Sequence, residues 1–459
     1  MSKKSNHLSR RGFLKAATIG AGAIAAPWVW IPKTAFAVSP AVGKAKHVIV
    51  FFAGGGMRTS GVFNGDVAKQ FNPYGILNTK ADWGVSSLFS TEPVELTTWG
   101  PGDVVPSFPD IAHEVAMLGA VDHAPGYMGG GITSHNTTPL RMATGYPGGL
   151  NSFFSHVGQW KAATSEKYIP PFVVGNQART FAMGVGEQAL YRAVTLSGPG
   201  DFSQLTGDFD ADDSGLSWNS ELEKALDTSF MNSRPYHVRQ KVKGTMQAKD
   251  DAMEFLETFL DPALHLTTQP DAGIGGITNE QLLEVFPDTH WCQRAAMAVR
   301  LLQIGSPIVA VGQGGYDNHS NEEMSLRPKI ESMGRALSGL KFVLQRLDHP
   351  EGGKYWDHTV IYACTEFGRD GTYADTGLNN GGGTDHQGSP ASRNQSCPVM
   401  GGPVTAGGKL IAPTDPMSYT AIDGNAVHSQ SLLSTALDVL GIKSDQFLEQ
   451  PPIHELFEV

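Results

Sequence analysis

The chain has 459 residues, and its 34 basic and 45 acidic residues give a formal net charge of −11. This balance excludes a basic nucleic-acid-binding protein, because an acidic chain repels the phosphate backbone, and we expect no nucleic acid partner. The 40% of apolar residues and the eight tryptophans exclude a disordered chain, while 54 glycines with only 17% charged residues indicate tight loops around a buried sheet.

Residues 1–37 have the pattern of an export signal. Residues 9–15 read Ser-Arg-Arg-Gly-Phe-Leu-Lys, which is typical of a twin-arginine leader, and Ala-Phe-Ala at 35–37 fits a cleavage site. The apolar run at 16–31 falls short of the ~20 residues that a membrane-spanning helix needs. We therefore expect the twin-arginine translocation machinery to export the chain and the leader to be removed. That leaves a periplasmic or secreted protein with no stable membrane span; a retained N-terminal anchor is the alternative.

The remainder of the chain, 38–459, alternates predicted strands with predicted helices. Continuous apolar runs, which indicate strands buried on both faces of a parallel sheet, lie at 46–53, 115–121, 171–174, 306–311 and 358–364. Helical patterns lie at 291–303, 322–347 and 429–440. This alternation predicts one layered α/β domain.

The middle of the chain differs from the rest. Residues 198–217 are rich in Gly, Asp and Ser, and residues 218–260 have a helical pattern with little strand content. We interpret 198–285 as an insertion or helical cap on the α/β body, not as an independent domain.

Carboxylate and imidazole side chains follow two of the predicted strands. Asp317 and His319 come after one strand, and Asp385 and His386 come after the next, each pair behind a glycine run. Ligands bind outside the carboxyl ends of strands in open α/β sheets, and these side chains suit a divalent metal. We expect zinc first, with manganese, iron or calcium as alternatives, although two solvated turns would explain the same residues. His428 is a further candidate ligand, or else a histidine near a helix cap.

The segment 129–138, Gly-Gly-Gly-Ile-Thr-Ser-His-Asn-Thr-Thr, leads into a predicted helix. Ser134 is the candidate nucleophile, since a metal and a helix N-terminus both lower the pKa of a hydroxyl. Thr133, Thr137 and a metal-activated water are alternative nucleophiles, and a glycine hinge followed by helix caps is the non-catalytic alternative. We expect His135 to shuttle a proton or orient an ester. Arg369 is the candidate cation for a developing negative charge, and Glu366 is expected to orient Arg369 or a metal ligand.

These motifs resemble the domain-of-unknown-function 1501 family of exported bacterial proteins. The resemblance rests on the segments 314–319, 365–369 and 383–386, and the leader and the segment around Ser134 also fit. The family is grouped with the alkaline phosphatase and sulfatase superfamily. The resemblance therefore implies a three-layer α/β/α sandwich with a helical insertion, and a metal centre of Asp and His ligands at the carboxyl edge of its sheet.

By the same resemblance, Asp317, His319, Asp385, His386 and His428 fall where metal ligands belong. One departure concerns the loop after the first strand, where the superfamily places an acidic ligand. Here residues 54–58 read Gly-Gly-Gly-Met-Arg, and the next carboxylate is Asp66. A second metal position is therefore lost or rebuilt in this chain.

Two functional classes follow from these observations. The first is an exported metal-dependent hydrolase of phosphate or sulfate esters, acting on a small molecule, a glycan or a lipid. The second is a non-catalytic exported protein that keeps the fold as a binding or assembly module. The Asp and His pairs favour the hydrolase, and the missing carboxylate favours the non-catalytic protein.

Overall fold

The computed structural model describes residues 41–123, 133–165, 168–199, 201, 258–259, 261–287, 290–319, 321–371 and 390–458. The chain divides into Met1–Ser39 and Pro40–Val459, and everything described here belongs to the second unit. The predicted leader, most of the predicted insertion, and the candidate ligands Asp385 and His386 lie outside the described residues and stay predictions.

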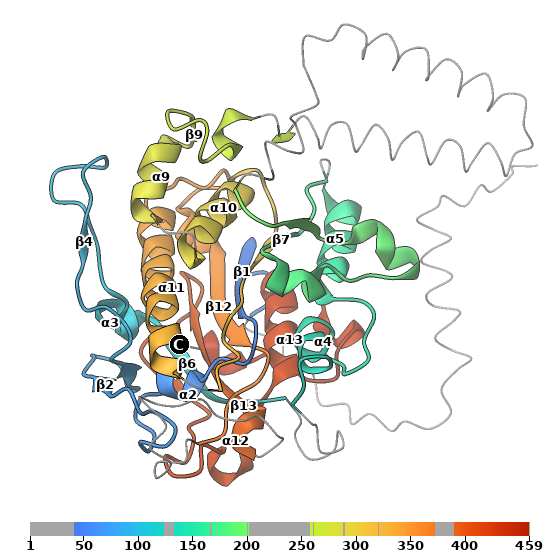
Figure 1. Ribbon diagram of the computed structural model, residues 1–459. Coiled ribbons are helices and arrows are strands. Elements are labelled where there is room, and N and C mark those ends of the chain that lie inside the picture. The colour runs from blue at the N-terminus through green and yellow to red at the C-terminus, as the bar shows by residue number, and fades with distance from the viewer. Residues whose placement is uncertain are drawn as a thin grey trace, which may run out of the picture. The chain divides into compact units, whose positions relative to one another are not determined.

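The centre of this unit is a nine-stranded mixed sheet, with the order β14-β6-β13-β12-β1-β11-β7-β8 and with β15 also paired to β6 (Figure 1). The strands are β1 (His47–Ala53), β6 (Ala116–Asp122), β7 (Phe172–Val174), β8 (Val194–Leu196), β11 (Ile308–Gln313), β12 (Thr359–Thr365), β13 (Asn394–Met400), β14 (Leu410–Ile411) and β15 (Val427–His428). β13 runs antiparallel to both neighbours, and every other strand of this sheet runs parallel to β1.

Both faces of the sheet are apolar, because successive side chains of a strand point to opposite sides. All seven residues of β1 are buried. Ile49, Phe51 and Ala53 belong to one hydrophobic cluster, and Val48, Val50 and Phe52 belong to a second cluster. Burial on both faces requires a helical layer on each side.

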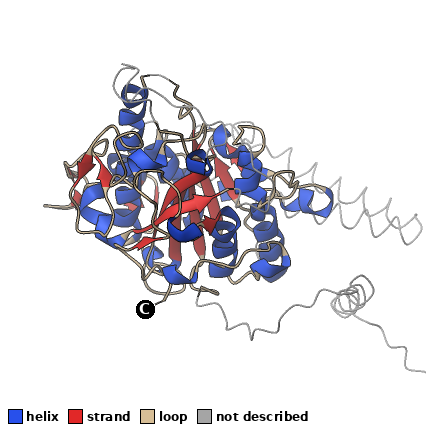
Figure 2. Ribbon diagram, turned by 90° about the horizontal axis from the view of Figure 1, so that it is seen from below, coloured by secondary structure: helices blue, strands red, loops and turns tan. Residues whose placement is uncertain are grey.

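Two helical layers cover the sheet. The first cluster includes side chains of α9 (Asn279–Val285), α10 (Trp291–Gln303) and α11 (Glu322–Leu344). The second includes side chains of α4 (Thr138–Thr144), α5 (Phe153–Thr164) and α13 (Ser429–Val439). Figures 1 and 2 show these two sets of helices on opposite sides of the strands. The predicted three-layer α/β/α sandwich is therefore confirmed.

Apart from the 3-10 helices, the other helices and strands within the described ranges are short. They are the helices α2 (Thr59–Val62), α3 (Phe108–Ile111) and α12 (Pro390–Arg393), and three strand pairs: β2 (Ile76–Leu77) with β3 (Val85–Ser86), β4 (Val94–Glu95) with β5 (Val104–Val105), and β9 (Gly273–Ile274) with β10 (Ile277–Thr278). Within the described ranges, no helix has both the length and the apolar character that crossing a membrane demands.

β13 is the long strand that the sequence pattern missed. Its sequence, Asn-Gln-Ser-Cys-Pro-Val-Met, is half polar and contains Pro398, which cannot donate to a neighbouring strand. The register against β6 shifts between Gln395 and Cys397, and this irregularity lies next to the proline. Its polar side chains are nevertheless buried, and Asn394, Gln395 and Ser396 each bond to the backbone of another segment.

Three histidines lie together at the amino edge of the sheet. The Nδ1–H of His47 donates to the carbonyl of Ser306 at 2.8 Å, so its Nε2 accepts a hydrogen bond from Nε2–H of His349 at 3.1 Å. The ring centroid of His358 lies 4.1 Å from that of His349. Burial and the facing His349 lower the pKa of His47 to about 3, against the bond to Ser306. Burial and the nearby His358 lower the pKa of His349.

Acid should therefore destabilise the fold through these histidines. A histidine of the unfolded chain titrates near pH 6.5, so below that pH the unfolded state binds protons that the folded state excludes, and stability falls as the pH falls toward about 3. For His47 alone, the free energy of unfolding should drop by about 2 kcal/mol by roughly pH 5. His47→Asn keeps a donor for Ser306 and should flatten this pH dependence in urea denaturation.

The matched control for this measurement is His113→Asn, in the short 3-10 helix Ala112–Glu114, where the histidine side chain is 44% exposed. This variant should keep the wild-type pH dependence. If the free energy of unfolding has the same pH dependence in His47→Asn and in the wild type, His47 does not cause the loss of stability in acid.

Candidate active site

Loops that begin side by side at the carboxyl edge of the sheet carry the candidate site. Ala53, the last residue of β1, pairs with Gln313 of β11 on one side and with Thr365 of β12 on the other. Asp317 lies four residues beyond β11, and Glu366 follows β12 directly. The parallel register therefore places both carboxylates at one edge, as the sequence predicted.

His135 lies between these two carboxylates. Its Nδ1 is 2.7 Å from Oε2 of Glu366, and its Nε2 is 3.4 Å from Oδ2 of Asp317. On the other side, Oδ1 of Asp317 is 2.9 Å from Nε2 of His319. The side chains of His135 and Asp317 are 41% and 42% exposed, whereas that of Glu366 is 9% exposed. The result is a row of alternating carboxylates and imidazoles, open to solvent at its centre.

The two carboxylates of this row have opposite pKa shifts. Burial raises the pKa of Glu366, although the hydrogen bonds from His135 and from the backbone of Gly55 partly offset it. Partial burial would also raise the pKa of Asp317. The hydrogen bond and charge of Arg369, with the two nearby histidines, outweigh that burial and lower this pKa.

The guanidinium of Arg369 is fully buried and holds the loops together. Its Nε donates to the carbonyl of Gly56 at 2.7 Å, and its Nη2 donates to the carbonyl of Gly55 and to Oδ1 of Asp317, both at 2.6 Å. In the structure these bonds make Arg369 a positioning residue for the loops. Its predicted role as the cation for a developing negative charge stays a prediction.

Glycines after β1 permit this close packing. Gly55 has φ of +111°, and a Cβ atom there would lie 2.6 Å from the backbone nitrogen of Asp317. A Cβ atom on Gly56 would overlap the ring of Phe367. An acidic residue at either position would push the loops apart, which explains why no carboxylate follows β1 directly.

The first charged residue after β1 is a cation. The buried side chains of Arg58 and of Glu322, at the start of α11, form an ion pair with Nε 2.7 Å from Oε2, and neither is exposed. Asp66, the next carboxylate along the chain, is exposed. The first charged residue of the loop after β1 is thus a buried, paired cation and not an acidic ligand.

Ser134 lies in the turn that leads into α4. Its backbone N–H donates to Oγ1 of Thr138 at 3.0 Å, and its Oγ accepts a hydrogen bond from the backbone N–H of Asn136 at 3.2 Å. The hydroxyl is next in sequence to His135. This position is compatible with the nucleophile predicted from the sequence, and it also fits the alternative of a local turn cap.

The row supplies two imidazoles and two carboxylates, from His135, Asp317, His319 and Glu366. These are ligand types that divalent metals bind. Among the described residues, however, no three His, Cys, Asp or Glu side chains form a ready metal cage. Asp385 and His386, the other predicted ligands, lie outside the described ranges.

A second polar group occupies the same edge, at the ends of β6 and β15. It contains His428, whose Nδ1 accepts a hydrogen bond from the backbone of Gln430 and whose strand position pairs with Asp122. It also contains His123 and Arg141, which the sequence analysis did not select. His123 comes shortly after the apolar run at 115–121. Asp317 was predicted as a site residue because it follows such a run, and the same criterion applies to His123.

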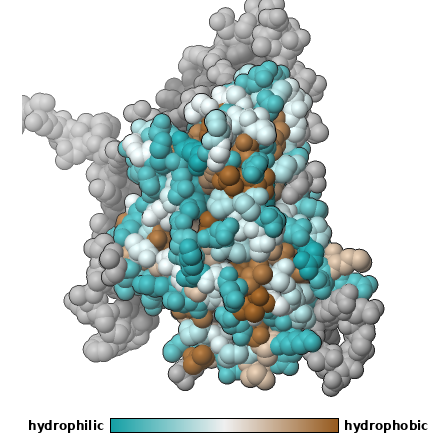
Figure 3. All heavy atoms as spheres, turned by 90° about the vertical axis from the view of Figure 1, so that its left-hand side faces the viewer, coloured by the Kyte–Doolittle hydropathy of each residue, from teal (hydrophilic) through white to brown (hydrophobic). Residues whose placement is uncertain are grey.

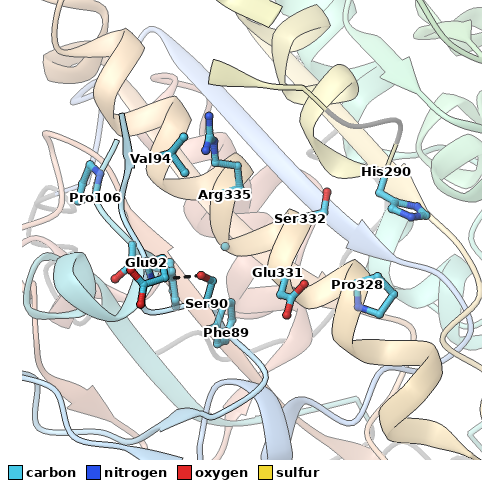
Figure 4. Close-up of a pocket in the computed structure, with 13 residues that line it drawn as sticks. Phe89, Ser90, Glu92, Val94, Pro106, His290, Pro328, Glu331, Ser332 and Arg335 are labelled. Carbon is cyan, nitrogen blue, oxygen red and sulfur yellow. Dashed lines mark hydrogen bonds between the residues drawn. The ribbon is translucent and has the colours of Figure 1, made fainter. Parts of the chain in front are cut away.

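Two cavities lie away from the predicted site residues. One, of about 590 Å³, is lined by His47, Lys161 and His349 at the amino edge. The other, of about 330 Å³, lies between α11 and the segments around Phe89 and Pro106 (Figure 4). Figure 3 shows the face with α11 and the β4–β5 pair as mainly polar, with separate apolar patches. Neither cavity contains any of the site residues predicted from the sequence.

This arrangement defines an α/β/α protein with a carboxylate–imidazole site at the carboxyl edge of its sheet. Residues 45–452 match the family described as protein of unknown function (DUF1501), and the chain belongs to this family. The family resemblance predicted from the motifs is therefore confirmed. No curated protein matches the chain.

Several solved structures are similar to the chain. A protein in the alkaline phosphatase superfamily from Vibrio parahaemolyticus is 10% identical, with 88% of this chain and 68% of that chain covered and a TM-score of 0.37. Ps i-CgsB in complex with k-i-k-neocarrahexaose is 11% identical, with 90% and 75% covered and a TM-score of 0.40. A TAB5 alkaline phosphatase mutant with Mg bound in the M3 site is 9% identical, with 87% and 99% covered and a TM-score of 0.35.

Removing the buried cation of the site should destabilise the fold. Arg369→Met removes the donor to two backbone carbonyls and leaves Oδ1 of Asp317 with His319 as its remaining partner, so we expect the free energy of unfolding to fall by about 3 kcal/mol in urea denaturation. The control Arg327→Met removes an exposed ion pair to Glu323 and should cost less than about 1 kcal/mol. Similar losses for the two variants would show that Arg369 does not hold the loops.

Proposed function

We propose that the chain is an exported, metal-dependent hydrolase of phosphate or sulfate esters. The observation that carries the proposal is the row formed by Glu366, His135, Asp317 and His319, in which 2.7 to 3.4 Å separate neighbouring groups. It lies at the sheet edge where open α/β folds bind ligands. Half-exposed groups beside a buried carboxylate are suited to chemistry on a bound molecule.

Asp317 and His319 would hold the divalent ion, with zinc as the first candidate, together with Asp385 and His386 from outside the described residues. When bound, such an ion supplies Lewis acidity that polarises an ester oxygen. The buried Arg369 lowers the pKa of Asp317, so this carboxylate stays ionised and ready to bind a cation.

The residues of the chain would move the proton. Glu366 accepts the hydrogen bond from Nδ1 of His135, which fixes the tautomer and leaves Nε2 as the atom that takes or gives a proton. The hydroxyl of Ser134, the neighbour of His135, would give its proton to Nε2 of His135 and attack the phosphorus or sulfur of the ester. The bond from that atom to the alcohol oxygen would break, and the alcohol would leave with the proton from His135. Water would then cleave the ester on Ser134 and release phosphate or sulfate. We thus assign Glu366 as the residue that positions His135, whereas the sequence predicted that it orients Arg369 or a metal ligand.

The second candidate function is a non-catalytic binding or assembly protein. One observation favours it: the loop after β1 carries Arg58, paired with the buried Glu322, where the superfamily resemblance implies an acidic ligand. A hydrolase of this design would have to work without that carboxylate.

Turnover separates the two candidates. We expect the full-length chain with bound zinc, assayed on a panel of phosphate and sulfate esters, to lose roughly 100-fold or more in kcat upon Glu366→Gln or Ser134→Ala. Asp317→Asn should lower the metal content measured by elemental analysis.

The exposed Asp271→Asn is the control for the loss of one carboxylate and should change neither kcat nor the metal content. Absence of turnover above the Asp317→Asn background, with metal bound to the wild type, would favour the non-catalytic protein.

Export is a separate part of the proposal. The twin-arginine machinery would recognise Arg10 and Arg11, and intact mass spectrometry of the exported protein should give a chain that begins at Val38. The double variant Arg10→Lys, Arg11→Lys should stay unprocessed in the cell. Export of this variant at the wild-type level, or a wild type that keeps its leader, would contradict the assignment.

A further inference from the structure

We infer that an oxyanion-binding subsite lies where β6, α4 and α13 meet, with Arg141 as its principal donor, so that the substrate is an ester with a second sulfate or phosphate group. This inference rests on the proposed function for the identity of the substrate. The subsite itself is defined by donors of three elements, and its binding of an anion can be measured without any turnover.

Arg141 presents an unused edge of its guanidinium. It lies on α4, seven residues after Ser134, and only 7% of the residue is exposed. Nη1 donates to the carbonyl of His123 at 3.2 Å. Among the described residues, the buried Nε has no hydrogen-bond partner. Nε and Nη2 form the edge that binds two oxygens of one sulfate or phosphate in parallel, and Nη1 is already directed elsewhere.

His123 supplies a second donor. The side-chain Oε1 of Gln395 accepts a hydrogen bond from the backbone N–H of Thr365 at 2.8 Å, so its amide nitrogen donates to Nε2 of His123 at 3.0 Å. The proton of this imidazole is therefore on Nδ1. Nδ1 is buried and has no partner within the described part of the chain, and His123 as a whole is 1% exposed.

The third donor is Ser429, the first residue of α13. Its Oγ is buried and also has no partner among the residues that the structure describes. The preceding residue, His428, pairs with Asp122 in the sheet, which brings the start of α13 next to the end of β6. The N-terminus of this 11-residue helix adds positive potential at the same place.

The charges in this region favour an anion over a cation. Asp122 is the carboxylate of the group, 3.9 Å from Arg393 and close enough to Arg141 to interact with its charge. Among the described residues of this group, two guanidinium groups against one carboxylate leave one positive charge.

The position of the subsite indicates a second group of the substrate and not the reacting one. β6 is two strands from β12 in the sheet, and strands lie about 4.8 Å apart, so the end of β6 is about 10 Å from the end of β12. The row at Glu366 follows β12. An ester that fills both places carries two oxyanion groups about 10 Å apart, as in a sulfated or phosphorylated glycan.

Calorimetric titration of sodium sulfate, and separately of phosphate, into the full-length chain at constant ionic strength tests the subsite. The wild type should bind one equivalent. Arg141→Lys keeps the charge but loses the two-donor edge, and should weaken binding roughly tenfold. Ser429→Ala removes one hydroxyl without a partner and should weaken binding roughly two- to tenfold. Arg179→Gln, at an exposed position of the 3-10 helix Asn176–Ala182, is the control for lost charge and should bind like the wild type.

The same titration with two disaccharides tests the substrate class. The wild type should bind a disulfated disaccharide at least tenfold more tightly than its monosulfated counterpart, and Arg141→Lys should lose most of that preference. No sulfate or phosphate binding by the wild type, or wild-type affinity in both Arg141→Lys and Ser429→Ala, would overturn the inference. If Arg141→Lys does not fold, Ser429→Ala alone decides. Anion binding without any ester turnover would support the subsite and count against the hydrolase.

Discussion

At the carboxyl edge of the sheet, the buried guanidinium of Arg369 donates to two carbonyls after β1 and to Asp317 after β11. It is fixed in turn by its own loop after β12. A fully buried cation is stable only where its donors are satisfied, so these loops must keep their positions relative to one another. The glycines at 55 and 56 allow the backbone to come this close.

This arrangement determines how the carboxylate of Asp317 is presented. Its Oδ1 is occupied by Arg369 and His319, while its Oδ2 lies toward the half-exposed His135. The ring of His135 is oriented from its other nitrogen by the nearly buried Glu366. The site therefore combines a rigid buried side with an open side, which is the general condition for acting on a bound ligand.

Arg58, Arg369 and Arg141 lie at this edge and have different roles, which follow from their hydrogen-bond partners. Arg58 and Arg369 are wholly buried and paired with carboxylates, so they stabilise loops. Arg141 is also largely buried, but its Nε has no partner among the described residues. A buried donor left without an acceptor costs free energy, and a bound oxyanion is one way in which that cost is relieved.

The sequence by itself determined the layered α/β fold, the places of β1, β11, β12 and of the long helices with ends that differ by up to three residues, and the sheet edge on which Asp317 and Glu366 lie. These features follow from local patterns: apolar runs mark buried strands, and residues directly after parallel strands share one edge. It missed β13, whose polar side chains bond to the backbone of other segments. Only the tertiary structure showed that Arg369 is buried and that Glu366 contacts His135. Burial and pairing depend on segments more than 200 residues apart in the chain, and no local pattern records them.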